Sequence, residues 1–186
     1  MSNHPHRLPA ARPPARAARR TRNRWLAAGL AGAALAVGGA MLLAGAGSHR
    51  ALAPTGEVNA MGMPVVATPG TAGGHAAAGG VEVTGADWAL GTVPLNVAVR
   101  PAWVLRNTGS NTVTLGEPKA EVRTGCCPGP LTLGATTLAP GASTTLTFEL
   151  SMHPGMAGPH DLGVHVPVSS GAAVEHLTLG VTGDFR

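Results

Sequence analysis

The chain has 186 residues with two cysteines, no tyrosine and a formal net charge of +4. Residues 1–50 hold eight Arg and no acidic residue, whereas residues 51–186 hold five basic and nine acidic residues, so the two parts carry +8 and −4. The larger part is therefore mildly acidic, and the whole chain has only two Phe and three Trp for stacking on bases, which argues against nucleic-acid binding. Two cysteines are also too few for a disulfide framework.

The N-terminal part of the sequence predicts a membrane anchor. Residues 1–24 are rich in Arg, Pro and Ala and lack an apolar period, which predicts a disordered cytoplasmic tail. Residues 25–46 carry no charge and, as a helix, are long enough to cross the hydrocarbon core of a bilayer. Seven Arg precede this segment and only Arg50 follows it closely, so the positive-inside rule places the tail in the cytoplasm.

A cleaved signal peptide is the alternative interpretation of the same segment. Ala44-Gly45-Ala46 fits the small residues of a cleavage site, but the apolar run is longer than a usual signal core, which favours an uncleaved signal anchor. Both interpretations export the remainder of the chain. We therefore expect a single-pass protein of the bacterial cytoplasmic membrane, with its C-terminal domain extracytoplasmic.

Residues 47–80 consist mainly of Gly, Ala, Pro and Thr without periodicity. This composition predicts a flexible linker between the membrane and the domain. Met61-Gly62-Met63 in this stretch is a candidate soft-metal contact, but Met in a tether more often has no such role.

Residues 81–186 predict an all-β domain. Apolar and polar residues alternate in segments such as 146–150, 162–168 and 177–181, and Pro101 suggests an edge or a bulge within residues 97–105. Seven to nine short strands separated by frequent turns predict an Ig-like β-sandwich. The residues that we expect in its core are Trp88, Trp103, Leu105, Leu146, Phe148, Val164, Val166 and Leu179.

Four motifs follow one another in this domain. They are Asp87-Trp88-x-x-Gly91-Thr92-Val93, Leu105-Arg106-Asn107-Thr108-Gly109, a cysteine loop, and Leu138-Ala139-Pro140-Gly141. This order, over about residues 85–183, resembles the bacterial Ig-like domains of unknown function, which are relatives of the ASH/Hydin-type sandwiches. The resemblance implies the sandwich fold but no activity. This chain has Gly-Cys-Cys-Pro where those domains have Ser-Cys-Gly-Cys.

Two loops carry the residues with distinctive chemistry. The first holds the cysteine pair between Gly125 and Pro130, and the second runs from Met152 to His160. Thiol, thioether and imidazole groups without nearby carboxylates favour a soft metal, above all copper as Cu(I), over Mg²⁺ or Ca²⁺. The candidate metal ligands are Cys126, Cys127, Met152, His153, Met156 and His160.

Plainer interpretations stay open for each group. The cysteine pair is equally explained by a structural loop or a vicinal disulfide, and Met152 and Met156 by packing under a turn. His160 shares the parity of Leu162 and is expected to point inward, whereas His165 is expected to point outward. The alternatives to a metal-binding module are a thiol-redox protein and an adhesion or assembly domain with a protein partner.

Catalytic motifs are lacking in the sequence. There is no Gly-x-Ser-x-Gly elbow, and neither a pair of glycosidase carboxylates nor a phosphate-binding glycine loop stands out. We therefore expect that the chain is not an enzyme.

Overall fold

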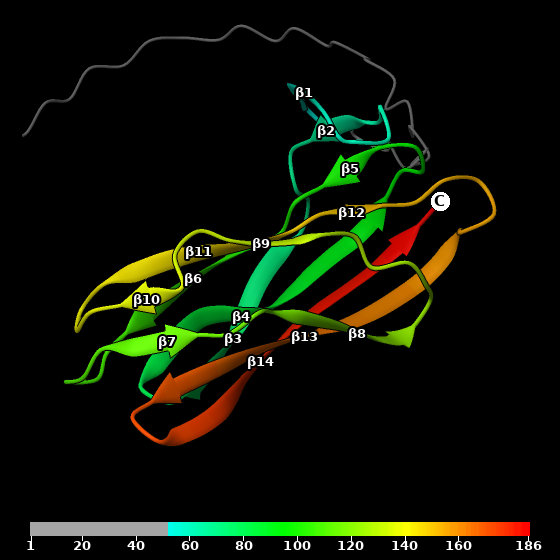
Figure 1. Ribbon diagram of the computed structural model, residues 1–186. Helices are drawn as coiled ribbons and strands as arrows, with labels where there is room; N and C mark the ends of the chain where they lie inside the picture. Colours follow the sequence, from blue (N-terminus) through cyan, green and yellow to red (C-terminus); the bar gives the residue numbers. More distant parts are fainter. Residues whose placement is uncertain (1–51) are drawn as a thin grey trace, which may run out of the picture. The chain divides into compact units, whose positions relative to one another are not determined.

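The computed structural model describes residues 52–186, which form β-strands around an apolar core (Figure 1). The all-β prediction is confirmed. In this described part of the chain, no helix is long and apolar enough to cross a membrane. The predicted tail (1–24) and transmembrane helix (25–46) lie outside the described residues.

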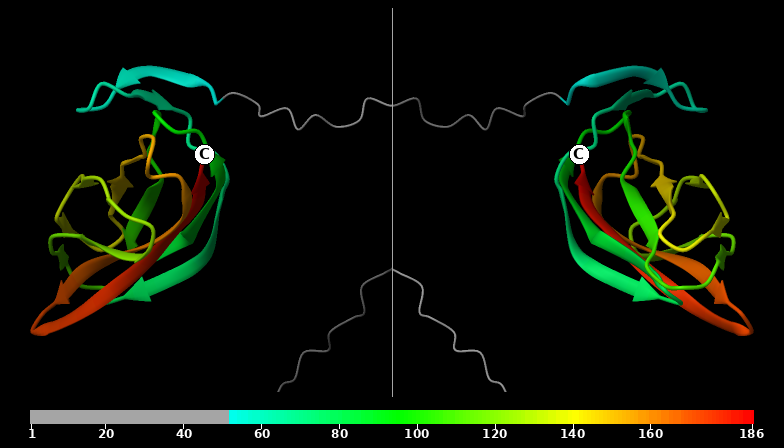
Figure 2. Two further views of the ribbon diagram at one scale, coloured as in Figure 1. Left: turned by 90° about the vertical axis from the view of Figure 1, so that its right-hand side faces the viewer. Right: turned by 90° about the vertical axis from the view of Figure 1, so that its left-hand side faces the viewer.

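The larger of two sheets has ten strands and curls, as the two side views of Figure 2 show. Its centre is a long antiparallel hairpin of β13 (Gly158–Ser170) and β14 (Ala173–Phe185). β14 also pairs in parallel with β4 (Val81–Val93). The other strands of this sheet are β3 (Thr71–Ala78), β6 (Ala102–Asn107), β7 (Val113–Leu115), β8 (Lys119–Thr124), β9 (Leu131–Leu133), β10 (Thr137–Leu138) and β11 (Ser143–Phe148). This curled sheet is consistent with an Ig-like β-sandwich.

The smaller sheet covers one end of this structure. Its four strands are β1 (Pro54–Val58), β2 (Pro64–Val66), β5 (Ala98–Val99) and β12 (Leu150–Ser151). The chain leaves this sheet for the larger one at Arg100–Pro101, between β5 and β6, which is the interruption that Pro101 predicts.

The predicted linker (47–80) is wrong for residues 54–78, which form β1, β2 and β3. β2 pairs with β5 and buries Val65 and Val66, while β3 pairs along β4 in an antiparallel ladder. β3 is rich in Gly and Ala because it lies at an edge with few side chains to bury, so it carries no alternation to detect. The predicted domain start at residue 81 is therefore too late. The predicted count of seven to nine strands is too low, because the described residues form fourteen.

The predicted core is confirmed except for Trp88, since the other seven residues are at most 2% exposed. Trp88 is half-buried, and its indole N–H donates to the carbonyl of Ala102 at 3.2 Å. A bulge at Gly85, whose φ is +78°, changes the parity of β4, so Val83 and then Ala86 face inward. The indole of Trp103 is the buried one, and it donates to Ala86 O at 3.0 Å.

Asn107, at the end of β6, forms hydrogen bonds with the backbone of the turn that follows this strand. Its side chain is fully buried and donates to the carbonyls of Asn111 (2.8 Å) and Leu138 (2.9 Å), while its Oδ1 accepts from the Gly109 amide (3.0 Å). One side chain thus bonds three backbone groups, of which the Leu138 carbonyl is reached in the buried interior.

We predict that Asn107→Leu lowers the free energy of unfolding by about 2–4 kcal/mol, because it removes these three hydrogen bonds, including the buried one to the Leu138 carbonyl. Urea unfolding of the full chain would measure the loss. Asn111→Ala is the matched control, because Asn111 is exposed and contributes only its backbone carbonyl, so its effect should stay within about 0.5 kcal/mol. Equal losses in the two variants would contradict this role for Asn107.

Candidate soft-metal site

The cysteine loop begins where β8 ends, and its position is fixed by the pairing of β8 with β13. Thr124 lies opposite Asp161 in this ladder, so Gly125 comes directly beside His160. A Cβ atom at Gly125 would lie 2.4 Å from His160 Cδ2, and the backbone there has a φ of +87°. Only glycine allows both the left-handed turn and this contact with the imidazole.

His160 is buried, as its parity predicts, with 5% of its surface exposed. Its Nδ1 lies 3.0 Å from the carbonyl oxygen of Gly158. Because a carbonyl only accepts hydrogen bonds, Nδ1 carries the proton of the neutral ring, and the Nε2 lone pair is left free. Phe185 holds the ring from the side in an edge-on contact, with centroids 5.0 Å apart.

The Nε2 lone pair faces the cysteine pair. Cys126 Sγ lies 4.0 Å from His160 Nε2, and both cysteines are free thiols. The hydrogen bond with the Cys127 thiol, followed by desolvation and repulsion from a Cys127 thiolate, raises the pKa of Cys126. The Cys127 thiol therefore contacts the Cys126 thiol, which in turn faces the oriented imidazole of His160 on β13.

The predicted ligands of the second loop lie in different environments. Met152 directly follows β12, and its side chain is fully buried in the core, away from the exposed His153. His153 is exposed, and its Nδ1 lies 2.9 Å from Pro154 O. Met156 is half-buried and packs against the edge of the core. His165 points outward, as expected, and contacts Glu121 at 3.1 Å.

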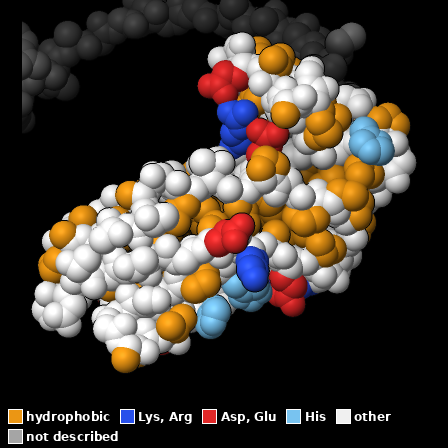
Figure 3. Space-filling model, viewed as in Figure 1, with side chains coloured by type: hydrophobic (Ala, Val, Ile, Leu, Met, Phe, Trp, Pro, Cys, Tyr) orange, Lys and Arg blue, Asp and Glu red, His pale blue; other side chains and the backbone are white. Residues whose placement is uncertain are grey.

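A cleft of about 330 Å³ lies on the Cys127 side of the loop. Cys127, His153 and Met156 line it, together with Met61 from the β1–β2 loop. Figure 3 shows hydrophobic side chains gathered over the loops at this end of the molecule. Met61 is not among the predicted ligands, because its segment has the composition of a linker; the pairing of β2 with β5 brings it here.

The described residues contain no group of three His, Cys, Asp or Glu side chains placed to hold a metal ion. Cys126, Cys127 and His160 are neighbours, but their side chains do not surround one point. Any further metal ligand at this end must be a thioether or His153. In residues 52–186, Cys126, Cys127 and His160 are therefore not already arranged as a closed metal site. The donors at this end are mainly sulfur and imidazole groups, which are of the soft and borderline kind.

No family model and no curated protein matches the chain. Among solved structures, it is similar to the ASH/PapD-like domain 7 of human CEP192, with 10% identity, coverage of 57% of this chain and 85% of that one, and a TM-score of 0.44. The VesB protease of Vibrio cholerae is 17% identical, with 53% and 30% of the chains covered and a TM-score of 0.42. The secreted serine protease VesC of Vibrio cholerae is 18% identical, with 57% and 23% covered and a TM-score of 0.42.

Two of these three structures are proteases, which overturns our expectation that the chain is not an enzyme. That expectation is not retained. The similarities assign no reaction to the chain, because such low identities and TM-scores describe the arrangement of strands alone. The chain also spans less than a third of either Vibrio protein, at 30% and 23% of their lengths.

The Gly125–His160 contact gives a direct test of the site's geometry. We predict that Gly125→Ala displaces the cysteine loop, because the new Cβ collides with the imidazole. Alkylation of Cys126 by iodoacetamide, monitored by mass spectrometry of the full chain, should become faster. The reason is that displacement of the loop exposes this half-buried thiol to solvent.

Gly155→Ala is the matched control, since Gly155 also has a positive φ (+99°) but nothing within 4 Å of its Cβ position. Both variants carry the backbone cost of about 1–2 kcal/mol for a left-handed alanine. Only Gly125→Ala should change the alkylation rate of Cys126. The same rate in both variants would show that the contact does not hold the loop.

Proposed function

We propose that this chain is a membrane-anchored, extracytoplasmic module that binds copper as Cu(I) through Cys126, Cys127 and His160. The observation that carries the proposal is the 4.0 Å approach of Cys126 Sγ to an imidazole nitrogen whose lone pair faces it. The Gly158 carbonyl orients the imidazole in the way that outer partners orient histidine ligands in metal sites.

The donor set favours a particular class of ion. Cys126 and Cys127 would supply thiolates and His160 an imidazole nitrogen, and such soft and borderline ligands suit Cu(I) better than a hard cation.

Oxidation threatens free thiols outside the cytoplasm, and a bound metal would protect them. In the proposed topology residues 25–46 anchor the chain, so the thiols lie outside the cytoplasm.

Competition titration of the reduced full chain in detergent, with a chromogenic Cu(I) chelator, tests the proposal. We expect one tightly bound Cu(I), and Cys126→Ser, Cys127→Ser and His160→Gln should each weaken binding by about 100-fold or more, because each removes a ligand. Circular dichroism would verify that each variant is folded.

Two variants serve as controls. His165→Gln removes an imidazole from the outer face of the same strand, and Met152→Leu replaces a core methionine with a residue of similar volume. Neither should change the affinity for Cu(I). Absence of Cu(I) binding, or binding unaffected by the cysteine variants, would refute the function and return attention to a redox role or a protein partner.

A further inference from the structure

The β1–β2 loop places a methionine over the cysteine loop from a distant part of the sequence. Met61 lines the same cleft as Cys127 and Met156, although 62% of its surface is exposed. Cys127 carries the exposed thiol of the pair and has a φ of 54°, a left-handed conformation that costs energy for a side chain of this type. The cleft thus has one thiol and two thioethers in its walls.

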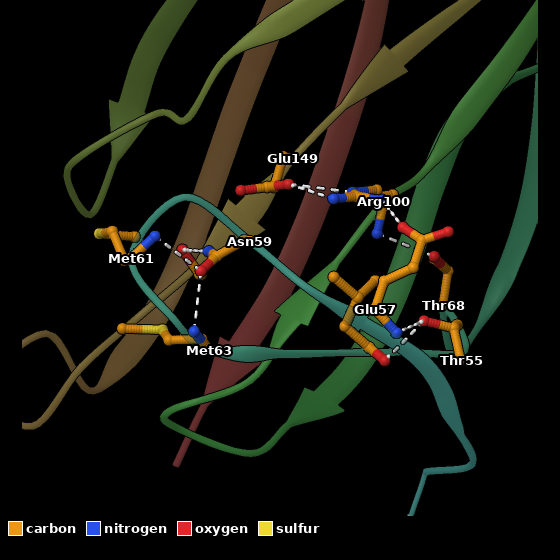
Figure 4. Close-up of polar contacts among 10 residues, drawn as sticks. Thr55, Glu57, Asn59, Met61, Met63, Thr68, Arg100 and Glu149 are labelled. Atoms are coloured by element: carbon orange, nitrogen blue, oxygen red, sulfur yellow. Dashed lines mark hydrogen bonds and ion pairs between the residues drawn. The ribbon is translucent and has the colours of Figure 1, made fainter.

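Asn59 holds this loop in place. It is buried, and its Oδ1 accepts from the amides of Met61 (3.0 Å) and Met63 (2.9 Å), as Figure 4 shows. Its Nδ2 donates to Ser151 Oγ at 3.3 Å, which attaches the loop to β12. A buried polar side chain therefore positions an exposed methionine against the wall of the cleft.

The charge of the cleft is also suited to a soft ion. The carboxylate that lines it belongs to Glu149, which is 15% exposed and accepts from Arg100 Nε at 2.9 Å. Arg100 binds Glu57 of β1 as well, so the same cation joins the two sheets (Figure 4). Because this carboxylate is already paired, the donors left to a metal ion in the cleft are the three sulfur groups and the imidazole of His153.

We infer that Met61 and Met156 supply thioether ligands to Cu(I) from the cleft side of Cys127, so that the β1–β2 loop is a methionine arm of the copper site. The inference rests on the proposed function and extends it by naming the ligands that select the metal. Thioethers bind Cu(I) and not Zn²⁺, since Met is no usual zinc ligand. The arm therefore gives the site its preference for copper, while the cysteines and His160 would bind either ion.

The test compares two metals on one set of variants of the reduced full chain. Met61→Leu and Met156→Leu, singly and together, should weaken Cu(I) binding, by about 10-fold in the double variant, with no change in Zn²⁺ affinity. Leucine keeps the volume of each side chain, so the cleft retains its walls. Met63→Leu is the matched control, because Met63 belongs to the same loop but does not line the cleft.

The outcomes separate this inference from the proposed function. Cu(I) binding that needs the cysteines but not Met61 or Met156 would overturn the methionine arm and leave the function standing. An equal loss of Cu(I) and Zn²⁺ affinity in the methionine variants would show a structural role, and would also overturn the inference. If the chain binds no Cu(I) at all, both the function and the arm are refuted.

Discussion

The pairing of β13 with its neighbours is the constraint on which the rest of the structure depends. This strand pairs with β14 along all thirteen of its residues and with β7 and β8 on its other edge. Since side chains alternate along a strand, the register that buries Leu162 and Val164 also turns His160 inward. The same ladder with β8 delivers the cysteine loop to that imidazole. The chemistry at this end therefore follows from the packing of the core.

Much of the fold was predictable because its central strands bury one face. The even positions of residues 162–168 and the odd positions of 177–181 are apolar, and the structure buries these faces. The same rule failed where strands bury little. β3 has small residues at an edge, so its sequence looks like a linker, and only its hydrogen bonds with β4 make it a strand. The bulge at Gly85 changed the pattern in another way, because one extra residue reversed the parity of β4, so that buried residues change from odd to even positions. Trp88 has the inward parity of Ala86 and Leu90 but is only half-buried.

The candidate site was predictable in its chemistry but not in its arrangement. Residue type marks Cys126, Cys127 and His160 as soft or borderline ligands, and parity places His160 inward. Sequence cannot tell a ligand methionine from a core methionine, because both are apolar side chains next to a turn. Met152 proved to be core, whereas Met61, which we had set aside, faces the cleft. The difference lies in contacts between segments far apart in the chain, such as Asn59 with Ser151.

Those long-range contacts also explain why the N-terminal hairpin belongs to the domain. A two-stranded hairpin is only marginally stable by itself, so β1 and β2 need support from outside. β5 and β12 extend them into a sheet, while Arg100 joins Glu57 of β1 to Glu149 beside the cysteine loop. This ion pair is partly shielded from water, because Glu149 is only 15% exposed, so it is screened less than a fully exposed pair. The segment that resembles a tether in sequence is therefore held where Met61 lines the same cleft as Cys127, and the β1–β2 hairpin forms one wall of that cleft.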